Sequence, residues 1–272
     1  MTRNRIITAL AMLIVLLPIF LFTQIETFSF LLLPIVALAA WEWARLLKFS
    51  VKHALLYCLA VLLTIPMMWS HALLAPALVL CAIFCWVIYV PYALYSGVHT
   101  IKPGERIFLM LMGIAVLCTC WLGFIGARQY GTSYLLSLLA VIWMSDIGAY
   151  FIGRAWGKHR LAAQISPGKT IEGALGGTLL SLIFVILLTL SNKLEPTFFG
   201  TAIVQHGWIS AILLTVLTIS AGIIGDLFES LLKRQANMKD SGHFLPGHGG
   251  ILDRIDALLP AIPLALLLNH LG

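Results

Sequence analysis

Carboxylates gather at the ends of two apolar stretches near the C-terminus. Asp226 lies near the end of one stretch, and Asp253 and Asp256 lie at the start of the next. An ionisable side chain at membrane depth costs about 3 kcal/mol even on lenient insertion scales, so these carboxylates need a compensating partner. Carboxylates in a low-dielectric cleft repel one another, and a hard divalent cation relieves the repulsion while taking oxygen ligands. The spacing therefore predicts that Asp226, Asp253 and Asp256 come together around a hard divalent cation, and Mg²⁺ suits such a set of carboxylates, waters and substrate phosphates.

The segment between these stretches carries groups that suit a phosphate. Its cationic side chains are Lys233, Arg234 and Lys239. Its glycines Gly247, Gly249 and Gly250 precede the next apolar stretch, where backbone N–H groups at a helix start favour an anion. A metal ion, cationic side chains and backbone donors in one place are typical of phosphoryl transfer, which depends on positioning and charge neutralisation.

A purely structural interpretation of the same residues also stays open. Inner loops rich in Lys and Arg are expected of any protein with many membrane spans. Asp253, Arg254 and Asp256 could form an ion-pair network at a helix end. The complete string with its ordered spacing favours a functional site, in which Glu229 is a candidate for a supporting position.

The elements that must position these residues are membrane helices. Of the 272 residues, 61% are hydrophobic and only 10% are charged, whereas soluble domains carry roughly 25% charged residues. Apolar stretches of about 20 residues, the length that crosses a bilayer, use most of the chain and exclude a separate soluble catalytic domain. We expect an all-α polytopic membrane protein with spans at 6–23, 28–47, 54–69, 72–94, 107–127, 134–153, 172–191, 207–228 and 251–271.

The distribution of basic residues predicts the orientation of these nine spans. With the N-terminus in the cytoplasm, all but two of the 17 Lys and Arg residues fall on the inner side, the exceptions being Arg128 and Lys193. Cytoplasmic loops carry an excess of these residues, so we expect the N-terminus inside and the C-terminus outside. Two long inner loops, 154–171 and 229–250, then place the site on the cytoplasmic face. We describe the chain as one continuous membrane domain, with N-terminal helices in 1–130 and C-terminal helices and loops in 131–272.

The string from Ser230 to Asp256 resembles the signature of the phosphatidate cytidylyltransferases, also called CDP-diacylglycerol synthases. The matching positions are Ser230, Lys233, Arg234, Lys239, Asp240, Gly242, Leu245, Pro246, His248, Gly249, Gly250, Asp253, Arg254 and Asp256. A second block, with Asp146–Arg154 ending one span and Ser166–Gly173 opening the next, is also similar to stretches of that family. The resemblance covers most of the C-terminal half, whereas the N-terminal half matches only as a set of apolar spans.

The second block has roles that follow from its position at a helix start. Ser166 or Thr170 can cap the helix that begins near residue 172, and Lys169 can reach a phosphate there. Asp146 lies deeper in the membrane and either supports catalysis or forms an interhelical hydrogen bond. Glu42, between two tryptophans at the inner end of the second span, is expected to be an interfacial anchor.

The resemblance implies an activity and a set of site residues. Members of the family transfer a cytidylyl group from CTP to phosphatidic acid, which yields CDP-diacylglycerol and pyrophosphate for phospholipid biosynthesis. The implied catalytic residues are Asp226, Lys233, Asp253 and Asp256, of which the three aspartates bind the metal. The implied substrate-binding residues are Ser166, Lys169, Thr170, Ser230, Arg234, Lys239, Asp240, His248, Gly249, Gly250 and Arg254. Mg²⁺ is the implied cofactor, and a second cation such as K⁺ is a further candidate.

The expected partners are CTP, phosphatidic acid and the lipid bilayer. The formal charge of +6 is explained by topology and anionic lipid head groups, and no nucleic acid is expected. The expected location is the bacterial cytoplasmic (inner) membrane with the site facing the cytoplasm. Whether the protein is a homodimer stays open.

Two other functions compete with this interpretation. A CDP-alcohol phosphotransferase also uses clustered aspartates and Mg²⁺, but its D-x-x-D-G-x-x-A-R pattern is absent, since Ala257 and Leu258 follow Asp256. A transporter or channel could use Asp226 and Asp146 as ion ligands, but transporters place such groups near the midplane between repeated halves. Here the charges cluster at one interface and no repeat is visible.

Overall fold

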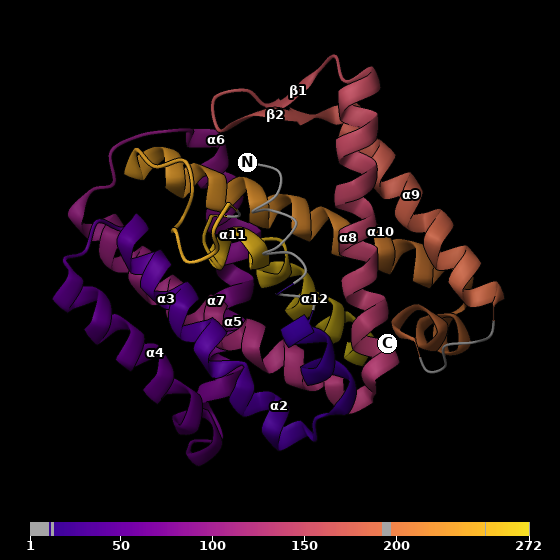
Figure 1. Cartoon of the computed structure of the whole chain (residues 1–272), viewed down its shortest axis with the longest axis horizontal. Coiled ribbons are helices and arrows are strands. Elements are labelled where there is room, and N and C mark those ends of the chain that lie inside the picture. Colours follow the sequence, from indigo (N-terminus) through magenta and orange to yellow (C-terminus); the bar gives the residue numbers. More distant parts are fainter. Residues whose placement is uncertain (1–10, 12–13, 192–196, 248, 272) are drawn as a thin grey trace. The chain divides into compact units, whose positions relative to one another are not determined.

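Long apolar helices dominate the computed structural model, which describes residues 11, 14–191, 197–247 and 249–271 (Figure 1). Within these ranges, seven helical segments are long and apolar enough to cross a membrane. Their bounds are Ile25–Leu46, Val51–Ser70, Leu74–Ser96, Pro103–Tyr130, Thr132–Trp156, Ile171–Leu190 and Phe198–Ala236. The expectation of an all-α polytopic membrane protein is therefore confirmed.

Each of these seven segments overlaps one predicted span. The predicted span 6–23 lies partly outside the described residues. The predicted span 251–271 is divided into α11 (Leu252–Ile255) and α12 (Leu258–Leu271), with a break at Asp256. The number of nine spans and the cytoplasmic N-terminus thus stay predictions.

By packing, the chain divides into two units, each described here by itself. Unit 1 comprises Met1–Ile125 and Phe228–Asp256, and unit 2 comprises Gly126–Leu227 and Ala257–Gly272. The helices α7 (Pro103–Tyr130) and α10 (Phe198–Ala236) contribute to both units. From the sequence, the membrane domain was divided into N-terminal helices (1–130) and C-terminal helices and loops (131–272). That division follows chain order, not packing, and it stays a prediction.

Unit 1 is built from the N-terminal helices, the C-terminal end of α10 and the segment that follows it. Its further elements are α2 (Ile25–Leu31), α3 (Leu33–Leu46), α4 (Val51–Ser70), α5 (Leu74–Phe84), the π-helix η1 (Cys85–Tyr89), α6 (Val90–Ser96) and α11. Side chains of α3 and α4 close onto α7: Trp43 Nε1 donates to the carbonyl of Leu109 at 3.0 Å, and Tyr57 Oη donates to that of Met110 at 2.9 Å. Gly113 permits this approach, because a Cβ there would overlap the Trp43 indole and the Tyr57 hydroxyl.

Unit 2 is centred on a tight pair of helices, α8 (Thr132–Trp156) and α9 (Ile171–Leu190), joined by a β-hairpin (Figure 1). Gly148 and Gly177 lie where the two backbones approach, and a Cβ on either would collide with the facing helix. Ser181 Oγ donates to the carbonyl of Val141 across the pair at 2.9 Å. Small residues thus let the two membrane helices approach closely, as is typical of helix pairs in membranes.

The hairpin consists of β1 (Arg160–Ala162) and β2 (Ser166–Thr170), which pair antiparallel. The sequence predicted only a loop here, because strands this short leave little periodic signal. Thr170 ends β2 and caps α9, since its hydroxyl accepts from the N–H of Gly173 at 3.1 Å. Of the two candidate caps, the structure therefore selects Thr170, while Ser166 lies at the start of β2.

Candidate functional site

The signature segment in unit 1 begins where α10 ends. The chain leaves the helix through Asn237, which has a left-handed φ of 62°. The N–H of Met238 donates to the carbonyl of Lys233 at 2.8 Å, and that of Asn237 to Arg234 at 3.0 Å. This pair of hydrogen bonds forms a Schellman motif, which satisfies the last carbonyl groups of the helix and reverses the direction of the chain. The turn directs the residues that follow it back toward the C-terminal end of α10, where Ser241 and Lys233 both contact Asp253.

Lys233 lies at the centre of a charged cluster in unit 1. Its ammonium pairs with Glu229 one turn earlier on α10 and donates to Asp253 Oδ1 at 2.6 Å. Glu229 is only 2% exposed, and the charges of Asp253 and Asp256 both act on it. The structure therefore brings together Lys233 and Asp253, and it places Glu229, the candidate for a supporting position, as their buried neighbour.

The carboxylate of Asp253 is held by the loop that precedes it. Asp253 Oδ2 accepts from the N–H of Ser241 at 3.0 Å and from the N–H of Gly250 at 2.7 Å, and it lies 3.0 Å from the Ser241 hydroxyl. These donors, together with the Lys233 ammonium, offset the cost of burying the Asp253 carboxylate.

Glu42 takes part in the same network, which the sequence did not predict. It is 1% exposed, so its interpretation as an interfacial anchor is wrong. Its carboxylate accepts from the N–H of Ile251 at 3.0 Å, from the N–H of Leu252 at 2.7 Å and from the Ser241 hydroxyl at 2.9 Å. The pattern W-E-W was typical of a membrane interface, and no local signal revealed partners some 200 residues away in the chain.

The glycines of the signature serve close packing around these carboxylates. Gly249 has a φ of +82°, and a Cβ there would crowd the Asp253 carboxylate. A Cβ on Gly250 would overlap both the Ser241 hydroxyl and the Glu42 carboxylate, and one on Gly242 would overlap Glu42. The N–H groups that the sequence suggested for a substrate anion donate, at Gly250, Ile251 and Leu252, to the protein's own carboxylates.

Gly250→Ala is expected to destabilise this loop, because the added methyl group cannot fit without moving two buried polar groups. Overpacking of this kind costs about 1–3 kcal/mol. The measurement is the melting temperature of the purified protein. Gly104→Ala is the matched control, since a Cβ there meets nothing within 4 Å. Equal melting temperatures for the two variants would contradict the proposed packing of Gly250.

A cavity of about 320 Å³ in unit 2 holds the other part of the predicted site. Its polar lining residues are Ser145, Asp146, Tyr150, Lys169, Thr170 and Asp226. Lys169 from β2 forms an ion pair with Asp226 from α10. Asp146, whose role the sequence left open, lines the same cavity as Asp226.

The remaining predicted residues have varied environments. Ser230 is buried, Arg234 is half-buried, and Lys239, Asp240 and Arg254 are exposed. His248 lies outside the described residues. In the part of the chain that the structure describes, no three His, Cys, Asp or Glu side chains form a group that could hold a metal ion. Asp226 belongs to unit 2 and Asp253 and Asp256 to unit 1, so their common metal site stays a prediction.

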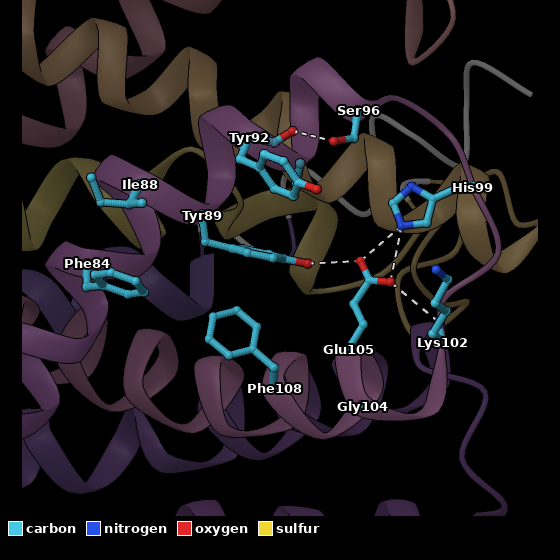
Figure 2. A pocket seen from close by; sticks show the side chains of 11 residues that line it. Phe84, Ile88, Tyr89, Tyr92, Ser96, His99, Lys102, Gly104, Glu105 and Phe108 are labelled. Atoms are coloured by element: carbon cyan, nitrogen blue, oxygen red, sulfur yellow. Dashed lines mark hydrogen bonds and ion pairs between the residues drawn. The ribbon is translucent and has the colours of Figure 1, made fainter.

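A larger cavity of about 750 Å³ lies in unit 1 between α5–α6 and the start of α7 (Figure 2). Figure 2 shows aromatic rings along its length and a polar cluster at one end. In that cluster, Glu105 accepts from Tyr89 Oη at 3.1 Å and from the N–H of Lys102 at 3.4 Å, and it pairs with His99 Nε2 at 3.0 Å. His99 Nδ1 lies 3.3 Å from Gln235 Nε2 at the end of α10. The polar cluster thus anchors the start of α7.

Comparisons with known proteins agree with the resemblance of the signature. Residues 3–271 match the model of a family described as the cytidylyltransferase family. The chain is 35% identical to the phosphatidate cytidylyltransferase of Pseudomonas aeruginosa over 266 residues, which cover 97% of this chain and 95% of that protein. It is 39% identical to the phosphatidate cytidylyltransferase of Bacillus subtilis over 168 residues, which cover 61% of this chain and 58% of that protein. The chain therefore belongs to the cytidylyltransferase family.

Proposed function

We propose that this protein is a phosphatidate cytidylyltransferase, which converts CTP and phosphatidic acid to CDP-diacylglycerol and pyrophosphate with the help of Mg²⁺. The main support is the family match along nearly the whole chain. It is combined with the network that joins the signature residues Lys233, Gly250 and Asp253 to Ser241. The apolar helices give this enzyme access to a lipid substrate.

The reaction requires two highly negative substrates to meet. A phosphate oxygen of phosphatidic acid attacks the α-phosphorus of CTP, a new P–O–P bond forms, and the bond to the β-phosphate breaks as pyrophosphate leaves. The attacking phosphate monoester is already anionic near neutral pH, so no general base is needed. The barrier arises mainly from charge repulsion, which cationic side chains and a metal ion reduce.

The chemistry of the donor set fits Mg²⁺, because Asp226, Asp253 and Asp256 offer carboxylate oxygens only, which hard cations prefer. These three residues would hold the ion. When bound, Mg²⁺ neutralises charge on the triphosphate and polarises the α-phosphorus. Asp253 Oδ2 lies within hydrogen-bond distance of three donors, whereas Oδ1 accepts from Lys233, so Oδ1 has more remaining capacity as an acceptor.

Two lysines occupy positions beside the proposed metal-binding aspartates. Lys169 pairs with Asp226, and Lys233 pairs with Asp253. Each ammonium group compensates a carboxylate when substrate is absent. On substrate binding, the same lysines would pair with phosphate oxygens, so that each positive charge stabilises the anion that the reaction brings in.

The proposed location is the bacterial cytoplasmic membrane, with the site facing the cytoplasm. Basic residues on the inner side support this orientation. CTP is a cytoplasmic substrate, and the phosphate of phosphatidic acid lies at the head-group plane. Both substrates would therefore reach the inner ends of the helices without crossing the membrane.

The decisive experiment incubates the purified protein with radiolabelled CTP, phosphatidic acid and Mg²⁺. We expect a lipid-soluble cytidine product and an equal amount of pyrophosphate, both lost on chelation with EDTA and restored by added Mg²⁺. Omission of phosphatidic acid is the control. Failure to form the labelled lipid would refute the proposed activity, whereas formation in excess EDTA would refute only the role of the metal.

Lys233→Gln is expected to reduce kcat/KM for CTP or phosphatidic acid by at least about tenfold. The reason is that a hydrogen bond from the Lys233 ammonium to a substrate phosphate contributes roughly 1.5–3 kcal/mol to binding. Steady-state kinetics with each substrate in turn identify the phosphate that Lys233 contacts. Lys52→Gln is the matched control, because Lys52 is exposed in the first turn of α4. Unchanged kinetics in Lys233→Gln would remove its phosphate role.

A further inference from the structure

Glu42 is a buried carboxylate that the proposed reaction does not use. It lies on α3, in a part of the chain where the sequence offered nothing but apolar spans. A carboxylate that is 1% exposed is costly unless hydrogen bonds compensate its lost hydration. Its three donors all come from the signature segment, at Ser241, Ile251 and Leu252.

The donors at Ile251 and Leu252 belong to the start of α11. The first N–H groups of a helix have no partner within the helix and are usually satisfied by a capping side chain. Ile251, the N-cap of α11, provides no such side chain. The Glu42 carboxylate satisfies these N–H groups from outside, and it thereby holds the residues just before Asp253 against α3.

Ser241 connects Glu42 directly to Asp253. Its hydroxyl lies 2.9 Å from Glu42 Oε2 and 3.0 Å from Asp253 Oδ2, and its own N–H donates to that same Asp253 oxygen. A hydroxyl has a single hydrogen, so it donates to one carboxylate at a time while remaining within reach of both. The N–H of Asp253 also lies 3.3 Å from the Ser241 oxygen. The serine therefore ties the orientation of Asp253 to the position of Glu42.

The glycines of the signature show that this contact is close. At Gly242 and Gly250, any side chain would overlap the Glu42 carboxylate. The backbone at these two glycines therefore packs directly against Glu42. Without Glu42, the donors at Ser241, Ile251 and Leu252 would lose this acceptor.

We propose that Glu42 is a positioning residue for Asp253: through Ser241 and the start of α11, it sets the orientation of that carboxylate. The inference rests on the proposed role of Asp253 in phosphoryl transfer. It assigns the N-terminal helices a part in the site, since α3 supplies the acceptor for the donors at Ser241, Ile251 and Leu252. Removing a residue that hydrogen-bonds to a metal ligand and orients it typically lowers activity or metal affinity about 10–100-fold.

The first test compares Glu42→Gln with wild type by hydrogen–deuterium exchange of the full-length protein without metal or substrate. An amide in place of the carboxylate turns an NH₂ group toward at least one donor, so peptides covering 249–255 should exchange at least about tenfold faster. Peptides from α8 and α9 should not change. Glu26→Gln is the matched control, because Glu26 is exposed in the first turn of α2. Unchanged exchange at 249–255 would overturn the proposal.

The second test measures the Mg²⁺ concentration that gives half-maximal rate. A loss of correctly oriented Asp253 should raise this concentration about tenfold in Glu42→Gln, whereas a loss of folded protein lowers only the maximal rate. Ser241→Ala removes the connecting hydroxyl and no charge, and it should also raise the Mg²⁺ concentration for half-maximal rate. If Glu42→Gln does not fold, the Ser241→Ala variant alone tests the proposal. An unchanged Mg²⁺ requirement in the folded variants would overturn the proposal. If wild type itself makes no product, the proposed function fails, and hydrogen exchange alone decides whether Glu42 orders the loop.

Discussion

Asp253→Asn is expected to abolish CTP-dependent release of pyrophosphate, with a loss of more than about 100-fold. The physical reason is that both carboxylate oxygens are in use. If the amide nitrogen replaces Oδ2, it faces three donors from Ser241 and Gly250, and if it replaces Oδ1, it faces the Lys233 ammonium. In either orientation, the amide group introduced by Asp253→Asn faces another hydrogen-bond donor, and the negative charge that would hold Mg²⁺ is lost.

Stability must be measured alongside the activity of Asp253→Asn. Removing one partner of a buried ion pair typically costs about 3–5 kcal/mol, and the Asp253 side chain is only 7% exposed. Pyrophosphate release should therefore be normalised to folded protein, as judged by the melting temperature and by size-exclusion chromatography. Glu26→Gln is the control for loss of one carboxylate elsewhere. Full turnover in folded Asp253→Asn would remove the metal-site assignment.

Asp226→Asn is expected to cause a similar loss of turnover with little loss of stability. Its ion pair with Lys169 is partly exposed, with 33% and 26% of the two side chains accessible, and such pairs contribute about 0–1 kcal/mol to folding. The substitution keeps the size of the side chain in the unit 2 cavity but removes the charge available to a cation and to Lys169.

Asp226→Asn is therefore the cleaner of the two variants for separating catalysis from folding. The measurement is pyrophosphate release over a range of Mg²⁺ concentrations, with the melting temperature as the control for folding. Lys169→Gln should weaken substrate binding without the same loss in maximal rate, because Lys169 is proposed to hold phosphate and Asp226 to hold the metal. Wild-type turnover in Asp226→Asn would contradict the assignment of Asp226 to the metal site.

Part of the structure followed directly from patterns along the chain. Apolar length predicted the helices, and the seven membrane-length segments overlap predicted spans. Polar residue types at a helix start predicted the cap of α9, which Thr170 provides. The β1–β2 hairpin was missed, because its three- and five-residue strands are too short for a periodic pattern.

The sequence by itself determined the class of protein and the residues of the signature, because both depend on local composition and spacing. Only the tertiary structure decided which groups those residues contact. Glu42 lies about 200 residues before Ser241 and Leu252, and Lys169 lies on a hairpin far from Asp226 along the chain. Hydrogen bonds and ion pairs between such distant residues depend on how helices pack, and a buried carboxylate is stable only where the fold supplies its donors.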